Sequence, residues 1–302
     1  MSLLVREAGL QSLLVDFGRE RSRALGVPVG GAADRAALAL GNALVGNAPH
    51  AVALEAAFAG PTVEALHQAA CVIFGAPFQS SVNGNAVATG VTFTLQSGDV
   101  LRVGGTQVGS RAYLCVAGGF DAPEVLGSRS ALEAIRAGDT LACAASRTEA
   151  RRLPFCEAAS GCTLRTLGGP QRDWFTDDSF FAQEYIVSPA SNRMGLRLKG
   201  TPLARTPGEL VSEAVAPGAV QVANDGLPIV LGADGQTIGG YPKVAHVIRA
   251  DLDRLAQLRP GDRVRFVRVT SEEAEDVARE RAAFLASWLT RLRIAERQPV
   301  LG

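Results

Sequence analysis

The feature that most constrains the fold of this 302-residue chain is a set of three short motifs that occurs twice, in the same order and at nearly constant spacing. Glu55-Ala56-Ala57 returns as Glu213-Ala214-Val215, Phe74-Gly75-Ala76 as Leu231-Gly232-Ala233, and Ser97-Gly98-Asp99 as Pro260-Gly261-Asp262. An internal duplication would produce this pattern, and two similar β domains would then enclose a cleft, a common location for ligand sites. Because each match is short, chance recurrence of strand–turn patterns is the alternative explanation.

Length and composition are consistent with two packed domains. A chain of 302 residues exceeds the usual size of a single core, although large β architectures can reach it. Hydrophobic residues make up 47% of the chain and charged residues 20%, and its 33 glycines are typical of a compact protein with many tight turns. Residues 146–152 are polar and arginine-rich, with few apolar side chains to bury, so they form a candidate linker. We therefore expect two domains, at residues 1–150 and 151–302.

Helix signals occur in two parts of the chain. Asp34 is a good N-cap for a helix near residues 34–45, whose apolar positions form one stripe and which ends at Gly46-Asn47. Thr270 and Glu273 form a capping box at the start of a long C-terminal helix with an apolar face. Most of the remaining sequence has β character, so we expect a mainly β protein with a few helices.

Strand and turn signals fill much of the rest of the chain. Residues 3–5 and 12–16 indicate two short strands around a turn at Gly9. Two further dipeptides predict hairpin turns, since both central residues of a type I′ turn need a positive φ. They are Asn83-Gly84, between strands at 80–82 and 91–93, and Asp225-Gly226, between strands at 220–222 and 229–231.

Charge and cysteine usage limit the partners and the compartment. Thirty basic residues balance thirty acidic ones, so no net field attracts nucleic acid or an anionic membrane, and a small molecule or a protein is the expected partner. No stretch approaches the roughly 20 apolar residues of a membrane span, and no export signal is evident. The cysteines form no C-x-x-C pair, which favours reduced, structural thiols in a cytoplasmic protein. They are Cys71, Cys115, Cys143, Cys156 and Cys162.

Several common enzyme signatures are absent from the sequence. There is no G-x-x-x-x-G-K-[ST] phosphate loop, and the glycines of residues 104–109 lack G-x-G-x-x-G spacing. The three histidines, His50, His67 and His246, have neither H-E-x-x-H spacing nor cysteine companions, so we expect no metal site. No serine lies in a G-x-S-x-G elbow, which disfavours hydrolysis by a catalytic triad.

The strongest candidate site is the glycine-rich segment at residues 234–243. Glycines bring backbone amides close to a neighbouring ligand, and the polar side chains can offer hydrogen bonds or positive charge to a small amide or carboxylate. Lysine occurs only at positions 199 and 243, so a lysine in this loop suggests a need for a compact amine rather than a guanidinium. A hairpin loop with a solvated lysine is the alternative. The candidate residues are Gln236, Thr237, Gly239, Gly240, Tyr241 and Lys243.

A second polar cluster, residues 191–197, contributes Ser191 and Arg193. Arg193 could clamp a substrate carboxylate with two hydrogen bonds, although a surface arginine that caps nearby carbonyls explains the pattern too. Glu213 and its repeat mate Glu55 lie in apolar surroundings, where a carboxylate must be paired or have a raised pKa. Structural pairing across the duplication and acid–base catalysis are the two interpretations.

Seven short motifs occur in order over almost the whole chain. They are Asp16-Phe17-Gly18-Arg19, residues 26–34, Leu44-Val45-Gly46-Asn47, Ala117-Gly118-Gly119, Leu126-Gly127-Ser128-Arg129-Ser130, Ser191-Asn192-Arg193-Met194-Gly195 and Gly239-Gly240-Tyr241-Pro242-Lys243. Together they resemble the biotin-dependent carboxyltransferase-like family. Members of this family include the C subunit of 5-oxoprolinase, allophanate hydrolase subunit 2 (KipA-like) proteins and the carboxyltransferase part of urea carboxylase.

The resemblance implies a fold of two tandem cyclophilin-like β-barrel domains, in agreement with the repeat. It further implies a component of an ATP-dependent 5-oxoprolinase that converts 5-oxoproline to glutamate beside two other 5-oxoprolinase components, of the A type and the B type. ATP would then be bound with or by a partner. Lys243, Tyr241 and Gln236 would be catalytic, and the substrate would be bound by Arg193, Thr237, Gly239, Gly240, Ser191 and Glu213.

Two other activities within the family remain as alternatives. One is carboxyl transfer from carboxybiotin to urea or another amide, for which biotin would have to arrive on another protein, because this chain has no Met-Lys-Met segment. The other is a KipA-like regulatory protein, in which the barrels serve only as a binding surface.

Overall fold

In the computed structural model the chain forms two compact units, and every residue is described except 1, 149, 154–161, 176, 207 and 298–302. The first unit comprises Met1–Gly18, Asp34–Ala158 and Ala283–Gly302, and the second comprises Arg19–Ala33 and Ala159–Ala282. Within the candidate linker, Arg151 exchanges backbone and side-chain hydrogen bonds with Thr92 of the first unit. The proposed domain boundary near residue 150 stays a prediction.

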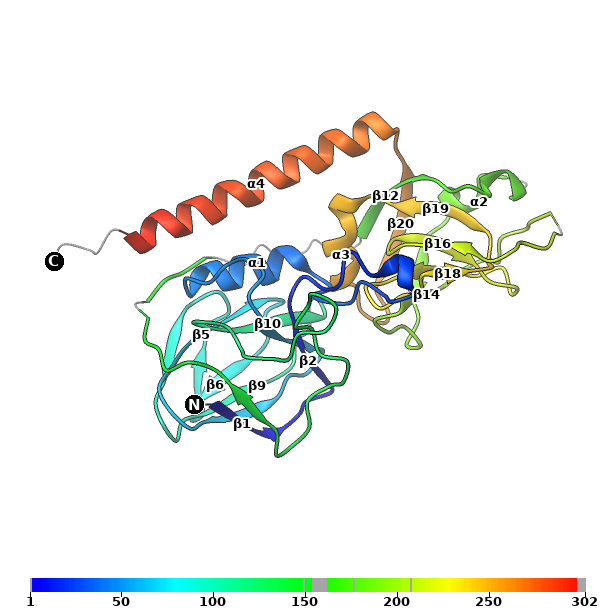
Figure 1. Ribbon diagram of the computed structural model, residues 1–302. Helices are drawn as coiled ribbons and strands as arrows, with labels where there is room; N and C mark the ends of the chain where they lie inside the picture. The colour runs from blue at the N-terminus through cyan, green and yellow to red at the C-terminus, as the bar shows by residue number, and fades with distance from the viewer. Residues whose placement is uncertain (1, 149, 154–161, 176, 207, 298–302) are drawn as a thin grey trace. The chain divides into compact units, whose positions relative to one another are not determined.

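The first unit is built from two antiparallel sheets, with strand orders β11-β1-β4-β9-β6-β7 and β2-β3-β10-β5-β8 (Figure 1). Apolar side chains of both sheets, such as Leu101 and Leu114, form one buried core. The strands are β1 Ser2–Glu7, β2 Gln11–Val15, β3 Ala53–Ala57, β4 Thr62–Ala65, β5 Ala69–Gly75, β6 Ser80–Val82, β7 Asn85–Val87, β8 Phe93–Leu95, β9 Val100–Val103, β10 Arg111–Val116 and β11 Thr140–Ala142.

Helix α1 (Arg35–Leu44) packs against β5 and β10 of this unit. The predicted cap is confirmed, since the Asp34 carboxylate accepts a hydrogen bond of 2.9 Å from the backbone N–H of Ala37. The backbone N–H of Asp34 donates to the Tyr113 hydroxyl, which in turn donates to Glu55. The start of α1 is therefore tied to two strands of the sheet beneath it.

A carboxylate clasp, which we define as Asp16 with residues 126–130, joins the end of β2 to a distant loop. Asp16 accepts hydrogen bonds of 2.6 and 2.7 Å from the Ser128 and Ser130 hydroxyls and of 2.7 Å from the backbone N–H groups of Gly18 and Arg129. Burial opposes the charge on Asp16, but these hydrogen bonds together lower the pKa of its carboxyl below the ordinary value. Two motifs more than a hundred residues apart in the sequence thus meet at one ionised side chain.

The second unit is a closed barrel in the order β12-β19-β16-β17-β14-β13-β20. A parallel pairing of β12 with β20 closes it, and the other pairs are antiparallel. The barrel strands are β12 Cys162–Gly168, β13 Tyr185–Val187, β14 Gly195–Lys199, β16 Ala219–Val222, β17 Pro228–Leu231, β19 Lys243–Val247 and β20 Arg263–Arg268. A separate two-stranded sheet pairs β15 (Glu213–Ala214) with β18 (Ile238–Gly239).

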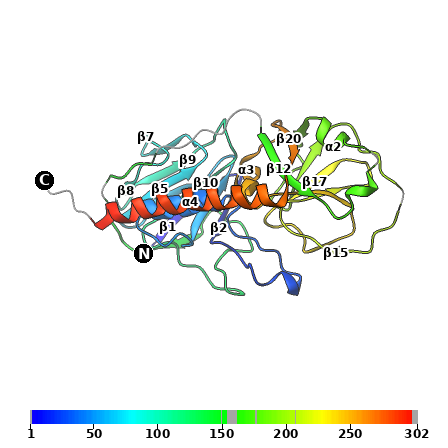
Figure 2. The ribbon, with the colours of Figure 1, turned by 90° about the horizontal axis from the view of Figure 1, so that it is seen from above.

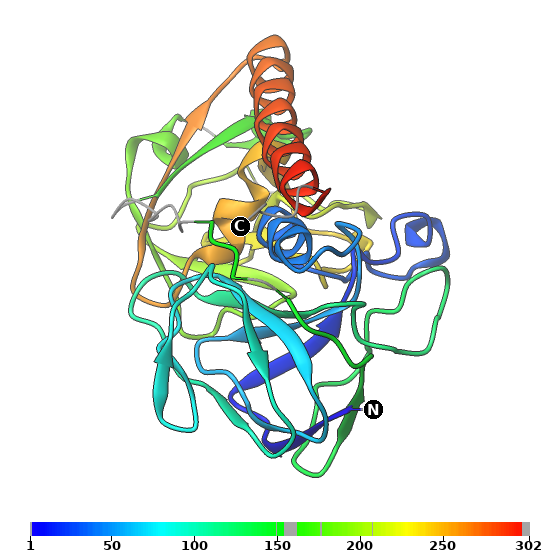
Figure 3. The same cartoon turned by 90° about the vertical axis from the view of Figure 1, so that its left-hand side faces the viewer.

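Short helical segments connect the barrel strands, and one long helix follows the barrel. The connecting segments are η2 Arg172–Trp174, α2 Ser179–Ala182, η3 Arg249–Asp251 and α3 Leu252–Gln257, and the long helix is α4 Ser271–Arg297. One more short helix, η1 Arg23–Leu25, lies between β2 and α1 in the sequence. The predicted capping box of α4 is confirmed: Thr270 accepts from the N–H of Glu273, and the Glu273 carboxylate accepts from the N–H of Thr270. Figures 2 and 3 show α4 from the side and from its C-terminal end as a single unbroken helix.

One predicted hairpin is correct in its turn and wrong in its second strand. Asn83 and Gly84 both have positive φ, as a type I′ turn requires. The partner strand is however β7, directly after the turn, rather than residues 91–93, because Val82 pairs with Asn85. A two-residue turn returns the chain immediately, so the strand had to follow it without a gap.

The second predicted hairpin has a longer connection than expected. β16 and β17 do pair, with Val222 opposite Pro228, which leaves five residues between the strands. Gly226 has a positive φ and Asp225 does not, so this is not a type I′ turn. The Asp225 carboxylate instead accepts a hydrogen bond from the N–H of Leu227.

The third repeated motif adopts the same turn in both units. Gly98 and Gly261 have φ of 89° and 93°, and the following carboxylates accept from the backbone N–H three residues earlier, Asp99 from Gln96 and Asp262 from Arg259. Arg136 and Asp139 form this turn once more within the first unit. Similar geometry at matched positions supports the duplication, and the third occurrence shows that the motif also recurs on its own.

The mainly β fold with few helices, one of them C-terminal, is confirmed. The described cysteines Cys71, Cys115, Cys143 and Cys162 form no disulfide, and Cys156 lies outside the described residues. Burial raises the pKa of the Cys143 thiol to about 11. Among the described residues, no helix is long and apolar enough to cross a membrane, and no cluster of three or more His, Cys, Asp or Glu side chains could hold a metal ion.

Removing the cap of α1 should destabilise the protein measurably. Asp34→Ala leaves the N–H of Ala37 without its acceptor, so we expect the free energy of unfolding to fall by about 1 kcal/mol. Asp34→Asn keeps an acceptor oxygen and is the matched control. Urea unfolding followed by circular dichroism measures both, and equal losses in the two variants would contradict a capping role.

The carboxylate clasp should make stability depend on pH. Because the folded pKa of Asp16 lies below its unfolded value of about 3.9, its contribution is complete above that pH and is lost as the pH falls through the folded pKa. Asp16→Asn should therefore be less stable than the parent at pH 7, by on the order of 1–2 kcal/mol. This difference should shrink towards pH 3 in urea titrations, and a difference independent of pH would contradict the assignment.

Candidate functional site

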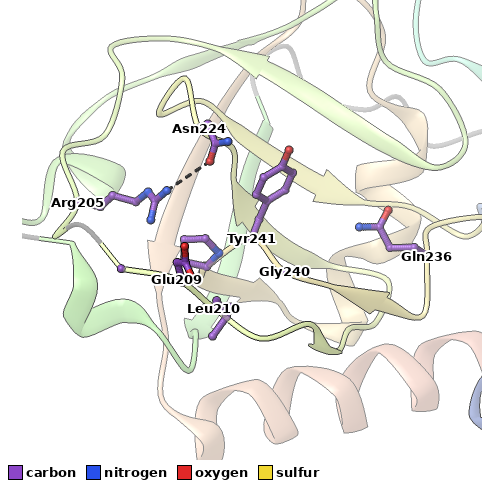
Figure 4. Close-up of a pocket in the computed structure, with 9 residues that line it drawn as sticks. Arg205, Glu209, Leu210, Asn224, Gln236, Gly240 and Tyr241 are labelled. Atoms are coloured by element: carbon purple, nitrogen blue, oxygen red, sulfur yellow. Dashed lines mark hydrogen bonds between the residues drawn. The ribbon is translucent and has the colours of Figure 1, made fainter.

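The loop at residues 234–243 lines a pocket of about 430 Å³ in the second unit (Figure 4). Asn224 accepts a hydrogen bond of 3.4 Å from Arg205 beside Tyr241, and Gln236 faces them from the other side of the pocket. Tyr241 is 38% exposed, so its ring is accessible to a ligand. The lining residues are Arg205, Gly208, Glu209, Leu210, Asn224, Gln236, Gly240, Tyr241 and Pro242.

Lys243 is not among the residues that line this pocket, and it is buried, at 5% exposure. Its ammonium group forms an ion pair with Glu213 and approaches the carbonyl oxygen of Tyr241 at 3.5 Å. The alternative of a solvated lysine is therefore wrong. The charge of Lys243 is held between a carboxylate on β15 and the backbone of the residue that lines the pocket.

Gln171, which the sequence reasoning missed, completes this arrangement. Its side-chain oxygen accepts a hydrogen bond of 3.0 Å from the backbone N–H of Lys243, and its side-chain nitrogen donates one of 2.8 Å to Glu213. Its backbone N–H donates to the carbonyl of Lys243. We call Gln171, Glu213 and Lys243 the lysine triad. Each member is fixed by the other two, so Lys243 has little freedom to move.

A glycine allows the close approach on which the triad depends. The backbone N–H of Gly169 donates to the carbonyl of Val244 at 2.9 Å, and a Cβ at Gly169 would overlap the carbonyl group of Lys243. Only glycine fits there without moving β19. The Gly168-Gly169-Pro170-Gln171 segment was therefore detectable as a turn signal, but its role depends on a strand some 70 residues away.

Two glutamine side chains, of which Gln221 is buried and Gln236 is exposed, connect the triad to the pocket. Gln221 lies opposite Lys243 on the neighbouring strand, and its side-chain oxygen accepts a hydrogen bond of 3.3 Å from Gln236. The side-chain nitrogen of Gln221 has no hydrogen-bond partner among the described residues. A Cβ at Gly239 would lie 2.5 Å from that nitrogen, so the absence of a side chain at Gly239 makes room for the amide.

The remaining predicted site residues are arranged in different ways. Thr237 is buried, and its carbonyl accepts from the N–H of Val215 beside the triad. Ser191 exchanges hydrogen bonds with the backbone of Arg197 at a turn and does not line the pocket. Thr237 is thus near the triad through its backbone, whereas Ser191 holds a turn.

Arg193 already binds a carboxylate of the protein itself. Its guanidinium donates two hydrogen bonds, of 2.7 and 2.9 Å, to Asp234 at the start of the loop and a third, of 2.6 Å, to the carbonyl of Gly31. This bidentate pair has the geometry foreseen for a substrate carboxylate, but with Asp234 as the acceptor. Arg193 therefore anchors one end of the loop, while the triad anchors the other.

The two repeated glutamates pair within their own units rather than with each other. Glu55 accepts a hydrogen bond of 2.8 Å from Tyr113 and lies 3.4 Å from the guanidinium of Arg111. The hydrogen bond of Glu213 to Lys243, together with that from Gln171, lowers the pKa of its carboxyl. Glu213 is therefore ionised at neutral pH and unsuited to act as a general acid.

Comparison with known proteins then identifies the family. Residues 25–268 match the family model described as carboxyltransferase domain, subdomain A and B. The chain belongs to this family. Over 287 residues the carboxyltransferase-domain chain is 38% identical to the C subunit of the Escherichia coli (strain K12) 5-oxoprolinase, and the match covers 90% of this chain and 93% of that relative.

Two longer proteins of solved structure resemble this chain. The protein TTHA0988 is 35% identical, with a TM-score of 0.81 over 88% of this chain and 55% of its own. The urea carboxylase of Kluyveromyces lactis is 26% identical, with a TM-score of 0.86 over 95% of this chain and 29% of its own. The chain therefore spans about half of the first protein and less than a third of the second.

Breaking the triad at Gln171 should destabilise the carboxyltransferase domain. Gln171→Ala leaves the buried backbone N–H of Lys243 without its acceptor, so we expect a loss of about 1–3 kcal/mol in the free energy of unfolding. Gln183→Ala is the matched control, because Gln183 exchanges two hydrogen bonds with Thr201 at an exposed position. Urea unfolding compares the two variants, and a loss at Gln183 as large as that at Gln171 would contradict a special role for the triad.

Proposed function

We propose that this chain is the C-type component of a 5-oxoprolinase, which acts with A-type and B-type components to open 5-oxoproline to glutamate. The observation that carries the proposal is the 38% identity to a protein of that name along 93% of its length. A relative that is named as one lettered component implies that others act with it. The pocket beside the loop at residues 234–243 supplies groups that suit this substrate.

5-Oxoproline presents one carboxylate and one ring amide, and the pocket carries a partner for each. Arg205 offers a planar pair of N–H donors that can bind the carboxylate. Arg193 is not available for this role, because its guanidinium already binds Asp234. The amide side chains of Asn224 and Gln236 can donate to and accept from the ring amide. The Tyr241 hydroxyl is the donor best exposed to stabilise negative charge on the amide oxygen as the ring opens.

Lys243 serves in this proposal as a positioning residue. Its ammonium group is engaged by Glu213 and by the carbonyl of Tyr241, so it fixes the backbone from which the Tyr241 ring projects. The glycines at 239 and 240 keep this part of the loop close to the triad.

The residues of this pocket do not fit ATP. Its lining carries one guanidinium, Arg205, and one carboxylate, Glu209, whereas a triphosphate carries about four negative charges at neutral pH. Such a ligand needs several cations or a cradle of backbone N–H groups. We therefore assign ATP to a partner protein and derive no step through it in this chain.

A second candidate function is carboxyl transfer from carboxybiotin to urea or a related amide. The likeness to the Kluyveromyces lactis urea carboxylase, with a TM-score of 0.86, favours it. The biotin would be carried by another protein, and the Gln236 and Asn224 amides would then bind the acceptor amide. ATP-dependent glutamate release by the assembled complex separates the two functions, because a carboxyltransferase would not produce it.

Lysine offers a matched pair of variants for the test. In a complex co-expressed with both partners, Lys243→Ala should lower kcat for glutamate release by roughly 10- to 100-fold, because Tyr241 loses its support. Lys199→Ala removes the only other lysine, on the exposed side of β14, and should leave kcat unchanged. Full activity of the Lys243→Ala complex would rule out the role assigned to Lys243.

Arg205 can be tested in the same assay. Arg205→Ala should raise KM for 5-oxoproline by about tenfold with a smaller effect on kcat, since a carboxylate clamp acts mainly in binding. An unchanged KM would exclude Arg205 as the carboxylate ligand. Folding of each variant is checked by thermal unfolding of the isolated chain.

A further inference from the structure

Helix α4 carries an exposed stripe of residues that does not belong to its buried side. Leu292 is buried and Leu285, Trp288 and Leu289 are half-buried, which defines the inner face of the helix. A neighbouring face presents six side chains at alternating intervals of three and four residues, five of them exposed. The stripe consists of Val277, Glu280, Phe284, Ser287, Arg291 and Ile294.

Two large apolar side chains of this stripe are exposed to solvent. Phe284 is 53% exposed and Ile294 is 54% exposed, although both are large and apolar. Alternation of three and four residues keeps side chains along one line of an α-helix, as in the seam of a coiled coil. Six such positions extend over about 25 Å of helix. A partner helix could therefore lie along the whole stripe.

The order of residues along the stripe identifies the partner. When a second copy of the stripe runs antiparallel, Val277 meets Ile294, Glu280 meets Arg291 and Phe284 meets Ser287, and each contact occurs twice by symmetry. Apolar side chains thus face apolar ones, the negative side chain faces the positive one, and the large side chain faces the small one. A parallel copy would instead place Glu280 against Glu280 and Arg291 against Arg291. Repulsion between these like charges disfavours the parallel pair.

The charges around the stripe support the same arrangement. The first turns of α4 carry four acids, whereas its last turns carry an excess of arginine, so an antiparallel pair brings opposite ends together. These end residues are Glu272, Glu273, Glu275 and Asp276, and Arg291 and Arg293. The Arg291 guanidinium lies over the Trp288 ring, 5.3 Å from its centroid, beside the stripe. Its charge is therefore placed at the edge where Glu280 of a second copy would arrive.

We propose that this stripe is a homodimerisation surface, on which α4 of a second copy of this chain docks antiparallel in the register described. The proposal is independent of the enzymatic activity. The polar layer of Glu280 and Arg291 makes the pairing weaker than an all-apolar seam would be, and it selects orientation and register.

Charge reversal tests the proposal with the full-length chain. Glu280→Arg and Arg291→Glu each replace two ion pairs by two like-charge pairs, so each should raise the dimer dissociation constant by about tenfold. The double variant exchanges the charges and should restore association. Sedimentation over protein concentrations of about 1 to 500 µM measures the equilibrium. Glu280 also acts electrostatically on Arg165, and Arg291 lies over the Trp288 ring, so restoration of association in the double variant is the decisive result.

A crosslinking experiment tests the register independently. Val277→Cys and Ile294→Cys proteins, mixed and oxidised, should form the mixed disulfide, because these positions meet only in the antiparallel pair. Disulfides between identical copies of either variant would instead indicate a parallel pair. Thermal unfolding confirms that each variant is folded. A parent protein that stays monomeric over the whole concentration range, or a double variant no better than the single ones, would overturn the proposal.

Discussion

The ion pair between Lys243 and Glu213, with Gln171 bound to both, is the interaction on which the candidate site depends. It joins three segments of the second unit, since Gln171 follows β12, Glu213 lies on β15 and Lys243 begins β19. A buried ammonium group is costly unless it is paired and hydrogen-bonded, and the triad satisfies both needs. The loop at residues 234–243 can therefore present Gln236 and Tyr241 to a ligand from a rigid support.

The same principle operates at the other end of the loop and in the first unit. Arg193 and Asp234 fix the start of the loop by a bidentate pair, and Asp16 gathers two serine hydroxyls and two backbone N–H groups. In each case one ionised side chain forms hydrogen bonds that join segments distant in the sequence. Charge-assisted hydrogen bonds are stronger than neutral ones, so a few of them suffice to hold loops that bury little apolar surface.

Local sequence signals predicted the local structure well. The cap at Asp34, the box at Thr270 and the turn at Asn83 depend on residues within a few positions of one another. The loop at residues 234–243 was recognisable because glycines and a rare lysine occur together there. Gln171 and Arg205 were not recognisable, since their roles depend on contacts with strands that only the folded barrel brings near. The hydrogen bonds of Arg193 to Asp234 could not be foreseen for the same reason.

The division of the chain into units has a consequence for its synthesis. The second unit includes residues 19–33, which leave the ribosome early, but its barrel needs strands that are made only after residue 160. The first unit in turn includes the last part of α4, which is translated after every strand of the barrel. Each unit therefore combines segments that are separated in the sequence by part of the other unit. Its earlier segments stay incomplete until the later ones have been made, a stage at which chaperones can assist folding.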